Sequence, residues 1–188
     1  MMQNQGVLSA VEPVKGRFFK LKANLERAGV DFAKCYMMDG RAVGMKTPER
    51  FDRILLDAPC SSEARFKFND PESWSHWNTR KIKESAKKQK RLILSAFHAL
   101  KEGGELVYCT FSFAPEENEK VVASLLKRYD ERMVLEPITL PMNNTTPGLT
   151  QWQGKVLPES LSYSLRILPD HVFDGFYLCR IRKTSTTR

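Results

Sequence analysis

The stretch Phe51-Asp52-Arg53-Ile54-Leu55-Leu56-Asp57-Ala58-Pro59-Cys60-Ser61 decides the fold of this chain. Its first six residues have the composition of a strand, and the carboxylate of Asp57 stands where that strand ends. Residues 7–11 and 33–38 are two similar segments, and they end at Glu12 and Asp39. We therefore expect three strands that each place a carboxylate in the loop that follows.

Segments with helical periodicity separate these strands. A helix opened by Pro13 and followed by Gly29 is predicted from the apolar stripe Val14, Phe18, Leu21, Leu25 and Ala28. A longer helix over residues 79–100, closed by Gly103-Gly104, is predicted from the stripe Ile82, Ala86, Gln89, Ile93, Phe97 and Leu100. A strand over residues 105–111 and a helix begun by Pro115 follow, with three acids that suit a helix N-terminus: Glu116, Glu117 and Glu119.

This alternation predicts an α/β fold, with an open and mostly parallel sheet in a single domain over residues 1–188. Late strands over residues 133–135 and 175–181 flank a loop near residues 142–148 that is rich in Pro, Asn and Thr. Ligands of such a sheet lie outside the carboxyl ends of its strands, so Glu12, Asp39 and Asp57 are expected on one rim. The alternative is that each acid caps the next helix. Three acids in series favour a nucleoside cofactor.

Composition limits the class of protein. Lys and Arg outnumber Asp and Glu by 30 to 22, which gives a formal net charge of +8 and suits a polyanionic partner. The four cysteines, Cys35, Cys60, Cys109 and Cys179, have no paired spacing, so we expect neither a zinc site nor a disulfide framework. The sequence has no long apolar run and no signal-like start. We therefore expect a cytoplasmic protein without a metal and without a membrane segment.

Cys60 lies in the loop at the mouth of the expected cleft, where a thiol can act as a nucleophile. A thiolate that adds to carbon 6 of a pyrimidine makes carbon 5 electron-rich enough to take a methyl group from a sulfonium donor. The alternative is that Cys60 is a small buried residue of a turn. The wider pattern of motifs must decide between the two.

That pattern resembles the Sun/Fmu-type RNA cytosine-5 methyltransferases over nearly the whole chain. The matching motifs are Asp57-Ala58-Pro59-Cys60-Ser61, Gln89 with Ile93-Leu94 and Gly103-Gly104, Leu106-Val107-Tyr108 with Glu116-Glu117-Asn118-Glu119, and Gly175-Phe176. The resemblance implies a class I, Rossmann-like methyltransferase fold, S-adenosylmethionine as cofactor, and a flipped-out cytosine of rRNA or tRNA as substrate. By the same resemblance Glu12 holds the cofactor ribose, Asp39 lies near the adenine, and Asp57 sits between cofactor and target base.

The chain departs from the family at the nucleophile. The family's Ser-Thr-Cys-Ser segment is Cys109-Thr110-Phe111-Ser112 here, so Phe111 stands where the attacking cysteine is expected. Cys109 lies two residues earlier, on the same face of a strand but about 6 to 7 Å back. Cys60, which in the family assists product release, is our preferred nucleophile. The remaining alternative is an inactive relative that only binds RNA.

A second departure concerns the start of the sheet. Family members carry an upstream strand and a glycine-rich loop that wraps the methionine part of the cofactor, and no such segment precedes Val7. The sheet is therefore expected to lack its usual first, central strand, between residues 7–11 and 51–56. We expect a partial catalytic domain whose open edges pair with a missing N-terminal segment or with another chain.

Basic residues crowd the start of the long predicted helix. They are Arg80, Lys81, Lys83, Lys87, Lys88, Lys90 and Arg91, and they predict salt-dependent contacts with RNA phosphates. Trp74 and Trp77 precede them and can stack on unpaired bases. The alternative for the basic residues is an ordinary solvated helix face, and the alternative for the tryptophans is an anchor of the loop onto the core. His76, His98 and His171 have no ligand spacing, and we expect surface or packing roles for them.

Overall fold

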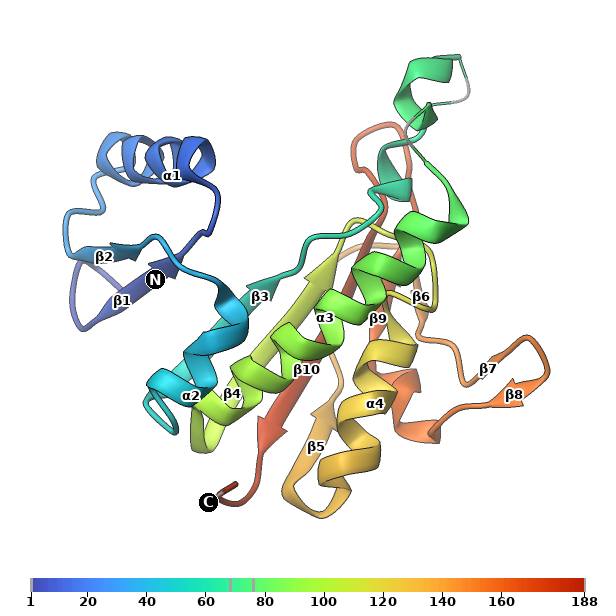
Figure 1. The fold of residues 1–188 in the computed structure, drawn as a ribbon. Helices are drawn as coiled ribbons and strands as arrows, with labels where there is room; N and C mark the ends of the chain where they lie inside the picture. The colour runs from blue at the N-terminus through green and yellow to red at the C-terminus, as the bar shows by residue number, and fades with distance from the viewer. Residues whose placement is uncertain (1, 68, 76, 188) are drawn as a thin grey trace.

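The protein is an α/β unit in a computed structural model that describes residues 2–67, 69–75 and 77–187 (Figure 1). The helices are α1 (Lys15–Arg27), α2 (Val43–Lys46), α3 (Thr79–Ala99) and α4 (Glu119–Tyr129), with short 3-10 helices that include η1 (Gly40–Ala42) and η2 (Glu63–Arg65). The strands are β1 (Leu8–Val11), β2 (Ala33–Tyr36), β3 (Phe51–Asp57), β4 (Leu100–Thr110), β5 (Met133–Glu136), β6 (Thr145–Pro147), β7 (Gln151–Trp152), β8 (Lys155–Val156), β9 (Leu165–Ile167) and β10 (Phe176–Lys183).

The central sheet has the strand order β3-β4-β10-β9-β6, and β5 also pairs with β10. Strand β3 is parallel to β4, whereas β10 is antiparallel to both β4 and β5. Because β10 opposes both, β3, β4 and β5 run in one direction and β10 runs against them. The predicted α/β fold with a mostly parallel sheet is confirmed.

Strands β1 and β2 form a separate parallel sheet, in which Val11 is paired with Tyr36. In the described part of the chain β1 pairs with β2, β3 pairs with β4, and no ladder joins β1 to β3. Leu55 of β3 is 71% exposed, although its neighbours in sequence are apolar. The prediction that these two strands would each lack one neighbour is confirmed for the described residues.

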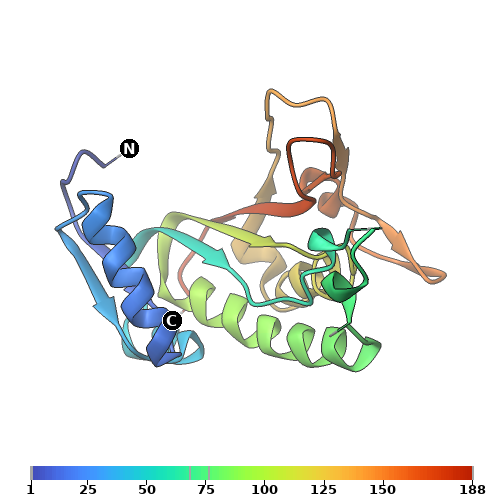
Figure 2. The same ribbon diagram turned by 90° about the horizontal axis from the view of Figure 1, so that it is seen from above.

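Helices α3 and α4 cover one face of the central sheet, as Figure 2 shows. The predicted stripe of α3 is buried from Ile82 to Phe97, because these residues recur at helical spacing and face the sheet. The core between the layers is built from Ile93, Phe97, Leu106, Tyr108, Val121, Val122, Leu125 and Ile181. Helix α1 packs on β2 through a half-buried stripe and has no fully buried residue.

Several predicted boundaries were wrong in detail. Helix α1 starts at Lys15 and not at Pro13, and α4 starts at Glu119 and not at Pro115. Helix α3 ends at Ala99, so Gly103 does not close it; Gly103 has φ +74 and lies in the irregular start of β4, where the register with β3 shifts. Strand β4 ends at Thr110, and Phe111 therefore lies beyond the strand.

Candidate functional site

The loop after β3 is held against the end of β4. The backbone N–H of Ala58 donates to the carbonyl of Cys109 at 3.0 Å, and that of Ala64 donates to the carbonyl of Phe111 at 3.1 Å. From α3, the Gln89 amide donates to the Pro59 carbonyl at 2.9 Å. Cys60, between these anchors, is half-buried. The loop thus presents one thiol from a fixed backbone at the carboxyl edge of the sheet.

The surroundings of the Cys60 thiol have opposing effects on its ionisation. Burial is the largest effect and leaves the pKa of Cys60 above its ordinary value, although the backbone N–H groups of Ser62 and Phe111 act to lower it. N–H groups directed at sulfur stabilise the thiolate, which is the nucleophilic form. The Ser62 hydroxyl lies 4.0 Å from the sulfur. Cys60 therefore has both partial exposure and donors for a negative charge.

Cys109 has a different environment. Its side chain is buried, and its thiol lies 3.7 Å from the Leu56 carbonyl and 3.9 Å from Asp57 Oδ1. Burial, followed by the nearby Asp57 carboxylate, raises the pKa of Cys109 to about 12. Since β4 ends at Thr110, the alternation that placed Cys109 and Phe111 on one strand face does not extend to residue 111. These contacts favour a structural thiol.

The Phe111 ring fills the position where the family resemblance predicts a nucleophile. It packs edge-on against Phe176 of β10, with the ring centroids 4.6 Å apart. The Arg65 guanidinium lies 4.9 Å from the Phe111 ring centroid. The ring is thus part of a small aromatic and cationic stack beside the Cys60 loop, and its backbone N–H rather than its side chain interacts with Cys60.

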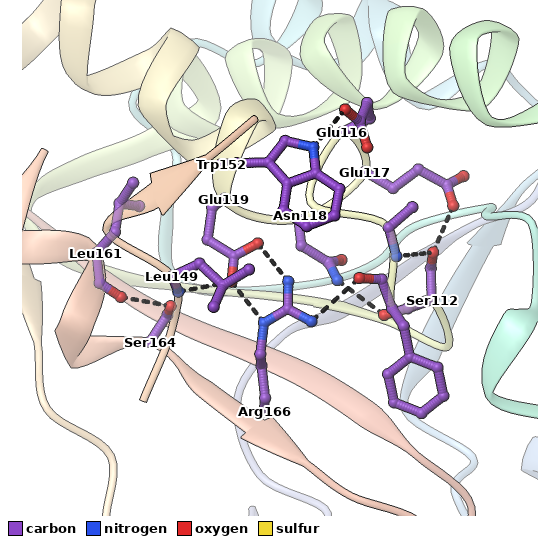
Figure 3. Close-up of polar contacts among 12 residues, drawn as sticks. Ser112, Glu116, Glu117, Asn118, Glu119, Leu149, Trp152, Leu161, Ser164 and Arg166 are labelled. Carbon is purple, nitrogen blue, oxygen red and sulfur yellow. Dashed lines mark hydrogen bonds and ion pairs between the residues drawn. The ribbon is translucent and has the colours of Figure 1, made fainter. Parts of the chain in front are cut away.

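A buried carboxylate to which the sequence patterns assign a different role supports the same loop. Glu117 is fully buried, and it accepts hydrogen bonds from Ser61 N at 2.9 Å and from Ser61 Oγ at 2.5 Å. It also accepts from Ser112 Oγ at 2.5 Å (Figure 3). The sequence predicts Glu117 to be one of three acids at a helix N-terminus. It lies before α4 begins, and it contacts the loop instead. The sequence feature that could have indicated this contact is the place of Glu117 in the segment between Ser112 and α4.

The other two acids of this segment also bind side chains from distant parts of the chain. Glu119, fully buried, forms a two-pronged ion pair with Arg166 of β9, with both N···O distances at 2.7 Å, while Glu116 accepts from Trp152 Nε1 at 2.9 Å (Figure 3). Arg166 also donates to the Phe113 carbonyl at 3.0 Å. This cluster joins the loop after β4 to the late strands.

Glu12 directly follows β1 and Asp57 is the last residue of β3, as expected, whereas β2 ends at Tyr36 and Asp39 lies three residues beyond it. Glu12 accepts from Val14 N at 2.9 Å and pairs with Arg17, whereas Asp39 accepts from Arg41 N at 2.9 Å and from its guanidinium. These hydrogen bonds from Arg41 lower the pKa of Asp39 to about 2. Both acids thus contact the start of the next helix, the alternative role considered from the sequence.

The same acids have acceptor chemistry that fits a nucleoside. The pairing of Val11 with Tyr36 places Glu12 and Asp39 at the same edge of their sheet, and Asp57 is exposed at the end of β3. In Figure 1 the arrows of β1, β2 and β3 point the same way. Carboxylates at such an edge accept hydrogen bonds from ribose hydroxyls. Glu12, Asp39 and Asp57 remain the predicted cofactor residues.

The predicted RNA-binding residues lie on the first turns of α3 and in the loop before it. Lys87 is exposed, Lys81 and Lys88 are half-buried, and Arg80 is exposed but pairs with Glu84 at 2.8 Å. Trp77, 38% exposed, donates to Glu63 Oε1 at 2.8 Å and packs edge-on against Phe66. The tryptophan thus anchors its loop, which was the alternative considered for it, and its stacking on RNA stays a prediction.

The remaining expectations concern metals, membranes and histidines. Among the described residues no group of three or more His, Cys, Asp or Glu side chains is arranged to hold a metal ion. Within the same residues, no helix combines the length and apolar character needed to span a bilayer. His98 packs against Tyr129, with its Nε2 2.7 Å from the hydroxyl, and His171 is exposed. His76 lies outside the described residues.

Comparison with known families and proteins gives consistent matches. The family model for the 16S rRNA methyltransferase RsmB/F matches residues 1–182. The chain is 39% identical over 183 residues to the tRNA (cytosine(49)-C(5))-methyltransferase of Pyrococcus abyssi, which covers 97% of this chain and 57% of that protein. It is 40% identical over 185 residues to the ribosomal RNA small subunit methyltransferase F of Vibrio parahaemolyticus, covering 97% of this chain and 36% of that protein.

Solved structures are similar as well. A methyltransferase homolog protein from Pyrococcus horikoshii has a TM-score of 0.78 at 33% identity, over 97% of this chain and 55% of that one. The structure of NSun6 from Pyrococcus horikoshii with SFG has a TM-score of 0.74 at 28% identity, over 97% of this chain and 42% of that one. The chain therefore spans between about a third and three fifths of the length of these proteins.

Proposed function

Because the chain belongs to the RsmB/F family of 16S rRNA methyltransferases, we propose that it transfers a methyl group from S-adenosylmethionine to carbon 5 of a cytosine in rRNA or tRNA. Support comes from relatives whose names state rRNA or tRNA methylation, and from the class I methyltransferase fold shared with the solved structures. The same proposal places residues 1–188 as part of a catalytic domain acting in the cytoplasm.

S-adenosylmethionine supplies an electrophilic methyl group on a sulfonium when it is bound. We assign Glu12 to the ribose, Asp39 to the adenine side and Asp57 to the space between cofactor and base. The observation that favours this assignment is the shared strand edge of Glu12 and Asp39, with Asp57 beside Cys109 at the end of β3. The ionised state of Asp39 is secured by Arg41, which keeps it an acceptor.

Cys60 is the proposed nucleophile, and one observation carries this choice. Cys60 is half-buried and its thiol interacts with two backbone N–H groups, whereas the Cys109 thiol is buried beside a carboxylate. In the proposed reaction Cys60 Sγ forms a bond to carbon 6, and carbon 5 then takes the methyl group as the bond between that group and the sulfonium sulfur breaks, which leaves a neutral thioether. The proton on carbon 5 leaves to a base, the bond between sulfur and carbon 6 breaks, and the thiolate returns.

Labelled methyl transfer to RNA tests this function. The intact chain, Cys60→Ala and Cys109→Ala are compared for methyl transfer and for a covalent adduct with RNA that carries 5-fluorocytosine, in which fluorine cannot leave as a proton. We expect Cys60→Ala to abolish both signals and Cys109→Ala to retain them. Transfer that survives Cys60→Ala would make Cys109 the nucleophile. RNA binding without any methyl transfer would show that the chain is an inactive relative that only binds RNA.

RNA binding is proposed for Arg80, Lys81, Lys87 and Lys88 on α3 and for Trp77 before it. Support comes from the density of cations on one helix, of which Lys87 is exposed. Arg80 shares its charge with Glu84, so we expect Lys81, Lys87 and Lys88 to contribute more than Arg80 to phosphate binding.

The unpaired edges of β1 and β3 are proposed to take up a further strand, from another segment or from another chain. Edge strands expose unpaired N–H and C=O groups and are templates for pairing. Hydrogen exchange of the backbone amides in β1 and β3, followed over a dilution series, tests the second case. Protection that falls on dilution supports pairing with another chain, and fast exchange at every concentration argues against it.

A further inference from the structure

The residues on both sides of Cys60 are held by one buried polar network. Ser61, which follows Cys60, donates its backbone N–H and its hydroxyl to Glu117. Pro59, which precedes Cys60, accepts a hydrogen bond from Gln89 at 2.9 Å, and the same Gln89 nitrogen lies 3.4 Å from Glu117 Oε1. Glu117, Gln89 and Ser61 are each fully buried. The loop is therefore held by buried hydrogen bonds at Pro59 and at Ser61, the residues on either side of Cys60.

A buried carboxylate is costly unless several donors satisfy it. Burial raises the pKa of Glu117, and hydrogen bonds from Ser112 and Ser61 offset part of this effect. Gln89 also donates to the carboxylate, and the backbone carbonyl of Glu117 accepts from the Tyr108 hydroxyl at 2.5 Å. Its donors come from the Cys60 loop, from the loop after β4 and from α3. A carboxylate that binds three separate segments at one point fixes their relative positions.

We propose that Glu117 is a positioning residue for the reaction at Cys60: it locks the backbone around the thiol and places a negative charge near the sulfur. The nucleophilic role of Cys60 rests on the proposed function, but the effect of Glu117 on the thiol does not. Neither RNA nor cofactor is needed to measure it.

The charges around Cys60 make this effect measurable. Burial raises the pKa of Cys60, and the charge of Glu117 raises it as well. Cys109 and Tyr108 also interact with the Cys60 thiol, but burial raises the pKa of Cys109 to about 12 and that of Tyr108 well above its ordinary value. Both are therefore neutral near pH 7. Asp57, Glu63 and Arg65 belong to the same loop region and are kept in every variant.

The experiment follows alkylation of Cys60 by iodoacetamide across pH, read by peptide mass spectrometry. Glu117→Gln keeps the size of the side chain and removes its charge. We expect the alkylation midpoint, the pH at which the alkylation rate is half-maximal, to fall by about half a pH unit to one pH unit. This shift raises the alkylation rate near pH 7 about three- to tenfold. Glu116→Gln is the matched control, because Glu116 binds Trp152 and Lys120 instead, and its midpoint should equal that of the unmodified chain.

Ser61→Ala serves as a second variant, because it removes one hydroxyl donor while Glu117 keeps its charge. We expect the high-pH plateau of the Cys60 alkylation rate to change at least about threefold when this hydrogen bond no longer holds the loop. If Glu117→Gln does not fold by circular dichroism, Ser61→Ala alone decides. Folded variants with the midpoint and plateau of the unmodified chain would overturn the inference, even if methyl transfer by Cys60 is found.

Discussion

At the scale of single residues, two cysteines near one site differ in how their thiols are surrounded. Cys60 is half-buried with backbone N–H groups nearby, and Cys109 is buried with a pKa of about 12. At pH 8 the Cys109 thiol is then almost entirely protonated. We expect iodoacetamide to modify Cys60 at least about tenfold faster than Cys109 in the folded protein. Peptide mapping checks this, and equal rates in the native state would contradict the assigned environments.

Phe111 occupies the position of the family's attacking cysteine, which makes it a test of how much that position matters. Phe111→Cys places a second thiol beside Cys60, while the N–H of residue 111 still faces the Cys60 sulfur. We expect this variant to increase methyl transfer or the covalent adduct with 5-fluorocytosine RNA by at least about tenfold, because an attacking thiol in place recovers rate lost to misplacement.

The matched control for this substitution is Phe111→Ala, which removes the same ring from Phe176 and Arg65 but adds no thiol. Both variants should be less stable, by about 1 to 3 kcal/mol, since the ring is half-buried. A gain that appears equally in Phe111→Ala would reflect loosening of the loop and not the new thiol. Thermal unfolding of both variants measures the loss of stability that they share.

At the scale of elements, α3 combines a buried face with a basic one. Its buried face fixes the helix on the sheet, so substitutions of lysines outside that face should leave the fold intact. We expect Lys87→Gln with Lys88→Gln to reduce the slope of log affinity for single-stranded RNA against log salt by about 1.4, which is about 0.7 for each phosphate that is no longer neutralised.

The control for α3 is Lys101→Gln, a lysine that follows the helix and pairs with Asp52. Fluorescence anisotropy at several salt concentrations measures the slope. A change that is the same for Lys101→Gln would mean that RNA responds to net charge alone and not to the α3 face.

Elements with a clear period could be predicted from the sequence, and those set by distant contacts could not. The α3 stripe and the strand that ends at Asp57 follow from spacing that one face of an element must satisfy. The short strand β6, by contrast, forms because it pairs with β9, and β9 holds Arg166 against Glu119. A buried acid such as Glu117 has the same letter as a surface acid, so only its tertiary partners identify it.

At the scale of the whole molecule, buried charges tie the end of the chain to its first half. Lys183, fully buried in β10, donates to the Leu100 carbonyl at 2.8 Å and to Glu49 at 2.9 Å. Glu49 also accepts from Thr186 Oγ1 and Thr187 N, so one carboxylate before β3 holds the segment that follows β10. The closing strand is thereby fixed next to β4, on which the site is built.

This arrangement predicts how stability depends on pH. Hydrogen bonds from Lys183, Thr187 and Thr186 lower the pKa of Glu49 from 4.5 to about 2. A carboxyl whose folded pKa is depressed stabilises the fold fully above its unfolded pKa, and this contribution is lost as pH falls from about 4.5 towards 2. We expect Glu49→Gln to lower the free energy of unfolding by about 1 to 3 kcal/mol at pH 7.

The difference between Glu49→Gln and the unmodified chain should then shrink by about half by pH 3, because the Glu49 carboxyl of the unfolded chain takes up a proton in that range while the native carboxylate stays ionised. Urea unfolding at pH 7, 5, 4 and 3 measures it. Asp52→Asn is the control, because Asp52 is an exposed partner of Lys101 and solvent screens such pairs, so they contribute little to stability. A difference for Glu49→Gln that stays constant from pH 7 to pH 3 would show that the charge of Glu49 does not stabilise the closing strand.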